Sequence, residues 1–199
     1  MRFRIFGTEF YVSFLFAAGI TAMLAFDRTG FILPLLFAVL IHELGHLTAM
    51  WVLDCAPKRI RLVPAAVEIT TKIGNGGKYE IFIALCGPAV NLLLFSVLFV
   101  NYLAFGNDSY LTVGLINLLI GLFNLLPVTG LDGGTVLFNI LCRKKEPSKA
   151  AFIMRIINFS VALAALITAV TLCFRGQFNL SFFILALYLA VMSIIKIYS

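Results

Sequence analysis

Both histidines of this chain lie in one pentapeptide, His42-Glu43-Leu44-Gly45-His46. On an α-helix this HExxH spacing puts two imidazoles one turn apart on the same face, which is the arrangement that a tetrahedral zinc ion needs. The glutamate between them can then act as a general base on an attacking water. The pentapeptide therefore predicts zinc-assisted hydrolysis, although so short a motif also arises by chance.

The sequence around the motif argues against chance. Between Phe31 and Leu53 the only ionisable side chains are those of the motif itself. A charged group at the middle of a membrane helix costs roughly 2.5–3.5 kcal/mol on insertion scales, so such groups are presumed to be functional. We therefore expect one zinc ion per chain, bound within an apolar segment.

A catalytic zinc needs a third protein ligand, and Asp132 is the one other acid inside a predicted span. It lies in Asn124-Leu-Leu-Pro-Val-Thr-Gly-Leu-Asp-Gly-Gly134, where proline and glycines interrupt the helix. Unwound backbone at membrane depth survives only if it is buried in protein or lines a watery cavity. Asp132 could instead cap a helix that begins at Gly133, and the two roles are compatible. Because the two histidines leave a catalytic zinc without a third protein ligand, we favour the metal-binding role for Asp132.

The elements that must position these residues are membrane helices. Of 199 residues 62% are hydrophobic and 12% charged, whereas a soluble domain is nearer a quarter charged. We predict one all-α polytopic membrane domain over residues 1–199, with a catalytic core at about 31–141. Its six expected spans, the fourth of them broken, are Phe10–Phe26, Phe31–Leu53, Ile81–Phe105, Tyr110–Leu141, Ala150–Phe174 and Asn179–Ile195.

The distribution of basic residues predicts the topology. Twelve of the fifteen lysines and arginines fall on one side of the predicted spans, two on the other, and Arg155 lies inside the fifth span. This positive-inside pattern places both termini in the cytoplasm, and it explains the net charge of +6 without a nucleic-acid partner. The start of the chain resembles a signal peptide but lacks a cleavage site, so we expect a retained helix. Four scattered cysteines indicate neither disulfides nor a thiolate metal site.

The segment from Asp54 to Glu80 is expected to form a small β-hairpin on the cytoplasmic side. Arg59–Val63 and Val67–Ile73 alternate with a period near two, and Gly74–Gly77 supplies a turn. A lid without chemistry is one interpretation. The other is that an edge strand holds an extended substrate by β-addition.

Three motifs together resemble the site-2 protease family of intramembrane zinc metalloproteases. Along the chain they are HELGH, then G-P-x-x-N from Gly87 to Asn91, then N-x-x-P-x-x-x-L-D-G ending at Gly133. They occur in the same order as in the family, and the resemblance covers about residues 31–141. The resemblance implies that His42, His46 and Asp132 bind zinc and that Glu43 activates the water. Thr129 stands where many members carry a proline.

Asn91 and Asn124 are the next candidate site residues. An asparagine in a membrane helix can join helices by hydrogen bonds worth under about 1–2 kcal/mol. Alternatively, their amides align a substrate strand or stabilise an oxyanion. The sequence leaves these two roles open.

The predicted function is an intramembrane zinc endopeptidase of a bacterial cytoplasmic membrane. We expect its substrate to be a membrane-anchored protein, and we expect a regulatory membrane partner. The resemblance is to the compact branch that includes a sporulation protease processing a pro-sigma factor, and it implies that the product is a released transcription regulator. The alternatives are a divalent-metal transporter, disfavoured by the apolar outer halves of the spans, and an inactive scaffold of the same fold. The sequence does not indicate an oligomeric state.

Overall fold

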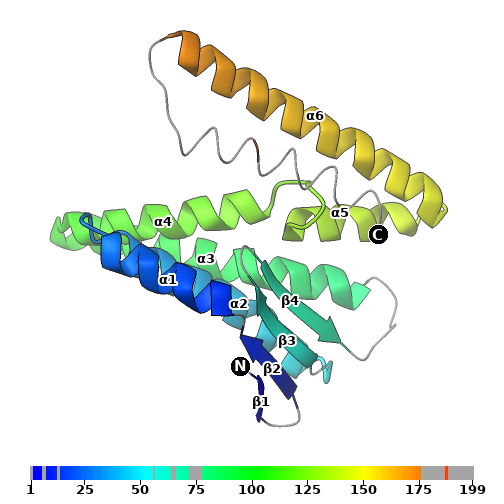
Figure 1. The fold of residues 1–199 in the computed structure, drawn as a ribbon, viewed down its shortest axis with the longest axis horizontal. Coiled ribbons are helices and arrows are strands. Elements are labelled where there is room, and N and C mark those ends of the chain that lie inside the picture. The colour runs from blue at the N-terminus through cyan, green and yellow to red at the C-terminus, as the bar shows by residue number, and fades with distance from the viewer. Residues whose placement is uncertain are drawn as a thin grey trace. The chain divides into compact units, whose positions relative to one another are not determined.

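The computed structural model describes residues 2–5, 8–12, 14–55, 57–63, 66–71, 78–175 and 187. This part of the chain falls into two compact units, Met1–Leu122 and Phe123–Ser199. The first contains four strands, three helices and most of a fourth helix; the second contains two helices (Figure 1). The elements are β1 Arg2–Ile5, β2 Thr8–Val12, α1 Phe14–Phe26, α2 Ile32–Val52, β3 Pro57–Val63, β4 Ala66–Thr71, α3 Lys78–Phe105, α4 Asp108–Asn124, α5 Asp132–Cys142 and α6 Pro147–Phe174.

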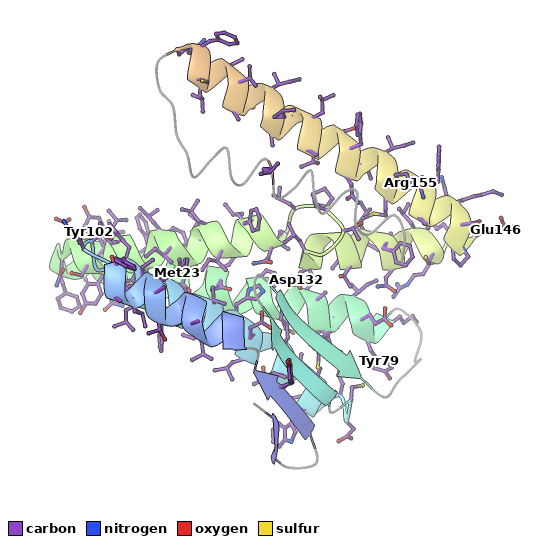
Figure 2. All side chains as sticks on the ribbon, in the orientation of Figure 1. Met23, Tyr79, Tyr102, Asp132, Glu146 and Arg155 are labelled. Carbon is purple, nitrogen blue, oxygen red and sulfur yellow. The ribbon has the colours of Figure 1, made fainter. Side chains whose placement is uncertain are left out.

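Three of these helices, α2, α3 and α6, are long and apolar enough to cross a membrane. Helix α4 is a shorter apolar helix of 17 residues. Large hydrophobic side chains are exposed along the long helices, as lipid-facing surfaces require (Figure 2). Examples are Phe37 on α2, Val97 on α3 and Phe159 on α6.

In the first unit, small residues let the helices approach closely. A Cβ atom added to Gly45 of α2 would lie 2.8 Å from the carbonyl oxygen of Cys86 on α3. A Cβ atom added to Gly121 of α4 would lie 3.4 Å from side-chain atoms of Leu92 on α3. Glycine at such contacts brings backbones together inside a membrane, where close packing rather than water exclusion drives association.

The N-terminal segment differs from the prediction of an all-α fold. Residues expected in the first span from Phe10 onward instead form β2, and α1 begins only at Phe14. The sequence of β1 and β2 mixes aromatic and β-branched residues with charged ones, which suits a strand. Hydropathy alone did not reveal the boundary between β2 and α1, because the apolar run of β2 continues into α1.

The strands form one sheet in the order β1-β2-β3-β4. Strands β1 and β2 pair antiparallel, β2 and β3 pair parallel, and β3 and β4 pair antiparallel. The 54–80 segment therefore contributes two of four strands. Its glycine-rich stretch, Gly74–Gly77, lies outside the described residues.

The fourth predicted span is broken, as its proline and glycines indicate. Helix α4 ends at Asn124, α5 begins at Asp132, and residues 125–131 form an irregular turn. In the second unit this turn packs on α6 through a core of Val128, Leu131 and Ala162. Helix α6 begins at Pro147, three residues before the predicted start, because proline suits the first helical position. The sixth predicted span, Asn179–Ile195, lies outside the described residues except Leu187.

Candidate metal centre

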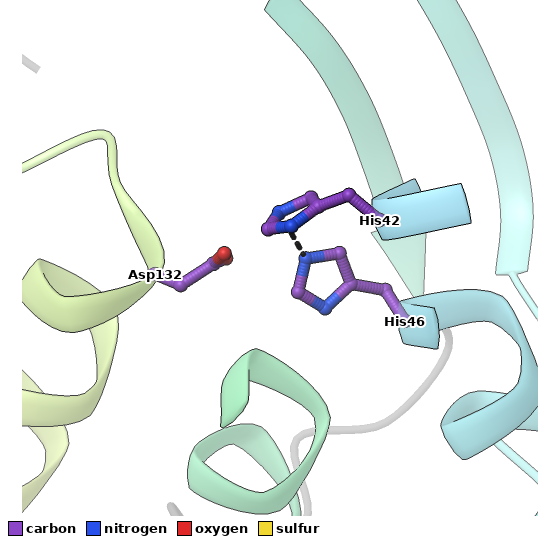
Figure 3. Close-up of side chains that lie close together, drawn as sticks. All are labelled: His42, His46 and Asp132. Carbon is purple, nitrogen blue, oxygen red and sulfur yellow. Dashed lines mark hydrogen bonds between the residues drawn. The ribbon is translucent and has the colours of Figure 1, made fainter. Parts of the chain in front are cut away.

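His42 and His46 lie one turn apart on α2 and are buried, with 4% and 7% of their surfaces exposed. Their Nε2 atoms are 3.2 Å apart, and their rings meet edge to face at an interplanar angle of 86° (Figure 3). The HExxH spacing has therefore placed the Nε2 atoms of both rings next to each other.

The opposite nitrogens are held by neighbouring helix α3. His46 Nδ1 donates a hydrogen bond to the carbonyl oxygen of Ile83 at 2.8 Å, and since a carbonyl can only accept, this nitrogen carries the proton. His42 Nδ1 donates to Oδ1 of Asn91 at 2.7 Å. Both rings are thereby fixed as Nδ1–H tautomers, which leaves a lone pair on each Nε2.

The two Nε2 atoms lie 3.2 Å apart, within the range of a hydrogen bond, so a proton or a metal cation can be shared between them (Figure 3). Tetrahedral zinc with Zn–N bonds of 2.0–2.1 Å would hold two nitrogens about 3.3 Å apart. The observed separation fits that value, so this half of the site has the geometry for such an ion.

Gly87 of α3 leaves space beside the two Nε2 atoms. An added Cβ atom would collide with Nε2 and Cε1 of His46 and would lie 2.9 Å from Cε1 of His42. The glycine of the G-P-x-x-N motif is thus required sterically, because any side chain at this position would collide with the imidazole rings.

Glu43 is partly buried on α2, one residue after His42 and three before His46. Its Cα atom therefore lies on the helical turn that separates the two histidines. Its position suits a proton carrier beside the imidazoles. Asn124, the last residue of α4, is also partly buried.

Asp132 belongs to the second unit, where it is the first residue of α5 (Figure 3). The residue that caps this helix is Leu131, which is extended and makes no side-chain cap bond. The alternative in which Asp132 caps a helix starting at Gly133 is therefore wrong.

The turn before Asp132 is held firmly. The amide of Leu131 donates to the carbonyl of Val128 at 3.0 Å, and Gly130 has a φ of +103° that side chains rarely adopt. Added Cβ atoms at Gly133 or Gly134 would collide with the backbone of the turn. The glycines are thus required by close backbone packing.

Two further polar residues were missed in the sequence. Asn117 of α4 hydrogen-bonds to Asn91, and Asn158 of α6 hydrogen-bonds to Thr129 in the turn. The available signal was an asparagine within an apolar helix, which calls for a partner. Nothing local in the sequence identifies that partner.

Comparisons with known proteins agree on one kind of relative. The model of peptidase family M50 matches residues 106–167. A zinc metalloprotease of Methanocaldococcus jannaschii is 34% identical over 139 residues, 67% of this chain and 40% of that protein. A Synechocystis protein is 36% identical over 118 residues, 54% of this chain and 30% of that protein. The chain thus spans less than half the length of either relative.

A solved structure matches over nearly the whole chain. The site-2 protease from Methanocaldococcus jannaschii aligns with a TM-score of 0.70 at 25% identity. The alignment covers 97% of this chain and 93% of that one.

Proposed function

This chain carries a peptidase family M50 domain of the site-2 protease type, and from that premise we propose that it is an intramembrane zinc endopeptidase. Its substrate is a membrane-anchored protein, cut within or next to its transmembrane segment. The observation that carries the proposal is that the Nε2 atoms of two buried histidines, His42 and His46, lie 3.2 Å apart.

Asp132 supplies the third ligand. Together with His42 and His46 it offers two imidazole nitrogens and one carboxylate oxygen, and catalytic zinc sites use three protein ligands of these kinds plus one open position. The support comes from the donor chemistry, from the family motif and from the rigid turn that ends at this residue.

Bound zinc would supply a Lewis acid that polarises the scissile carbonyl and acidifies water. The Glu43 carboxylate takes the proton of the attacking water and later delivers it to the leaving amine nitrogen. His42 and His46 keep their protons at Nδ1 throughout, because the Asn91 amide and the Ile83 carbonyl accept them there.

The two asparagines of the family motifs have different roles. Both amide hydrogens of Asn91 are engaged, one by the carbonyl of Ala38 and one by Asn117, so its role is to orient His42. Asn124, at the end of α4 next to the broken turn, contacts the substrate or the developing oxyanion.

Strand β4 presents the substrate. It lies at one edge of the described sheet, with β3 as its neighbour on the other side. A protease needs an extended peptide, and an edge strand can hold one by main-chain hydrogen bonds. Proline substitutions along Val67–Thr71 should therefore slow cleavage; unchanged cleavage would exclude this role.

The test compares the natural protein with Glu43→Gln in cells and after purification. Glu43→Gln should keep stoichiometric zinc and lose cleavage, and one full-length membrane protein should accumulate in its cells only. Asp132→Ala should lose the zinc as well. An active Glu43→Gln protein, or Asp132→Ala with undiminished zinc, would overturn the assignment.

A further inference from the structure

Asn117 is a fully buried amide on α4 that belongs to none of the three motifs. Both it and Asn91 on α3 are 0% exposed. Asn117 Oδ1 accepts a hydrogen bond from Asn91 Nδ2 at 2.9 Å, and its own Nδ2 donates to the carbonyl of Val113, one turn earlier on α4, at 2.9 Å. Each polar atom of this side chain therefore has a defined partner.

These contacts decide which way the amide of Asn91 points. Its Nδ2 faces two acceptors, the carbonyl oxygen of Ala38 at 3.1 Å and Asn117 Oδ1. In the flipped amide, the oxygen of Asn91 would face those two oxygens and its NH2 group would face His42. The observed orientation is the one that satisfies every group.

The orientation of Asn91 in turn fixes the proton on His42. With Oδ1 of Asn91 at 2.7 Å, Nδ1 of His42 must carry the proton and Nε2 keeps its lone pair. With the flipped amide, Nδ1 would have to accept, and the proton would move to Nε2, the nitrogen that faces His46.

We propose that Asn117 is a positioning residue that selects the metal-binding tautomer of His42 through Asn91. The proposal deepens the proposed function and rests on it for the role of the metal. It makes α4 part of the site that holds the two histidines, although α4 contributes neither of these histidines. Partners that orient a ligand in this way typically change metal affinity 10- to 100-fold.

The packing around Asn117 brings α4 close enough to α3 for this contact. Glycines stand three residues before it and four residues after it, on the same helix face. An added Cβ atom would lie 3.5 Å from Phe95 and Leu98 at Gly114, and 3.4 Å from the Cβ atom of Asn91 at Gly121. Small residues therefore flank this polar contact between the two helices.

The chain offers a direct readout, because it has only two histidines. Labelling the whole protein with 15N-histidine in nanodiscs gives signals from His42 and His46 alone, and their nitrogen shifts report the tautomers. His46 serves as the internal control, since Ile83 holds its Nδ1 without any asparagine.

The informative variants are Asn117→Ser and Asn117→Asp. A serine can bond the carbonyl four residues earlier, as Ser96 and Ser160 do in this protein, but it is too short to reach Asn91. Aspartate keeps an oxygen for Asn91, and in its neutral, protonated form, which burial favours, its O–H can still donate to the Val113 carbonyl that Asn117 Nδ2 binds. The matched control is Asn139→Ser, because Asn139 is a buried asparagine whose Nδ2 bonds within its own helix, to Thr135.

In the natural protein both rings should be Nδ1–H tautomers. Asn117→Ser should mix the tautomers of His42, leave His46 unchanged and weaken zinc binding 10- to 100-fold in chelator competition. Asn117→Asp and Asn139→Ser should bind zinc within about threefold of the natural protein.

Equal changes at both histidines, no change at either, or zinc binding by Asn117→Ser equal to that of Asn139→Ser would overturn the proposal. An Nε2–H tautomer of His42 in the natural, metal-free protein would overturn it without any variant. If the protein cuts no substrate but the tautomers behave as expected, then the proposed function fails and the role of Asn117 stands.

Discussion

Replacing Gly87 with alanine adds a single methyl group at the open face of the histidine pair. The new Cβ atom would lie 2.9 Å from Cε1 of His42 and would overlap Nε2 and Cε1 of His46. Ordinary contacts between such atoms are about 3.5–4.0 Å. His42 must therefore move by at least about 0.6 Å and His46 by more than about 1 Å, unless α3 withdraws from α2.

Movement of this size should cost far more activity than stability. A displaced His46 ring stretches its 2.8 Å bond to the carbonyl of Ile83 and turns Nε2 away from the metal position. A misplacement of about 1 Å in a catalytic site can cost about 100-fold in rate. Alanine is also a better helix former than glycine by about 1 kcal/mol, which offsets part of the steric cost to folding. We expect Gly87→Ala to cleave about 100-fold more slowly and to bind zinc more weakly.

The assay measures cleavage of a single-span substrate in proteoliposomes, zinc content and thermal unfolding of the same preparation. Gly114→Ala is the matched control, since its added Cβ atom would meet Phe95 and Leu98 at an ordinary 3.5 Å. That variant should keep activity within about twofold, because no ligand has to move. If Gly87→Ala keeps full activity and full zinc content, then the steric argument for this glycine is wrong.

Two further predictions concern the turns. Thr129→Pro removes the N–H that donates to Asn158 Oδ1 at 3.0 Å and the hydroxyl that accepts from Asn158 Nδ2 at 2.8 Å, so the free energy of unfolding should fall by about 1–3 kcal/mol. Adding Asn158→Leu should recover most of this loss in denaturation experiments, because no buried amide is then left without a partner. Between α1 and α2, the Thr29 hydroxyl and then the backbone N–H of Ile32 lower the pKa of Asp27 from 3.8 to about 2. This depressed pKa stabilises the turn above about pH 3.8, and the effect is lost as the pH falls to about 2. The protection factor of the Ile32 amide, which is its exchange rate corrected for the intrinsic pH dependence of exchange, should therefore fall over that range, and Asp27→Asn should remove this fall.

The histidine pair of α2, with its two side chains on one face, could be predicted from the sequence because its signal is local. Ionisable side chains in an apolar run have no reason to persist without a function, and the HExxH spacing fixes the face of the helix they share. The break before Asp132 was equally local, since Pro127 and the glycines cannot continue a helix.

The partners of the site were not predictable in the same way. Asn117 and Asn158 each look like a single polar residue in an apolar helix, and their partners lie 26 and 29 positions away. Which asparagine meets which group depends on how the helices pack, and no periodicity encodes that. The strands before α1 were missed because the apolar run after them continues without a polar boundary.

A buried amide suits the orientation of His42 better than the carboxylate that often fills this place in zinc enzymes. Aspartate at position 91 would accept the His42 proton as well, but its second oxygen would replace Nδ2, which lies 3.1 Å from the Ala38 carbonyl and 2.9 Å from Asn117 Oδ1. A negative charge would then face two oxygens in a buried setting, where unpaired charge is most costly. Asparagine supplies the same acceptor with no charge and uses its two hydrogens to bind α2 and α4. The neutral side chain therefore fixes the tautomer of His42 and joins three helices around it.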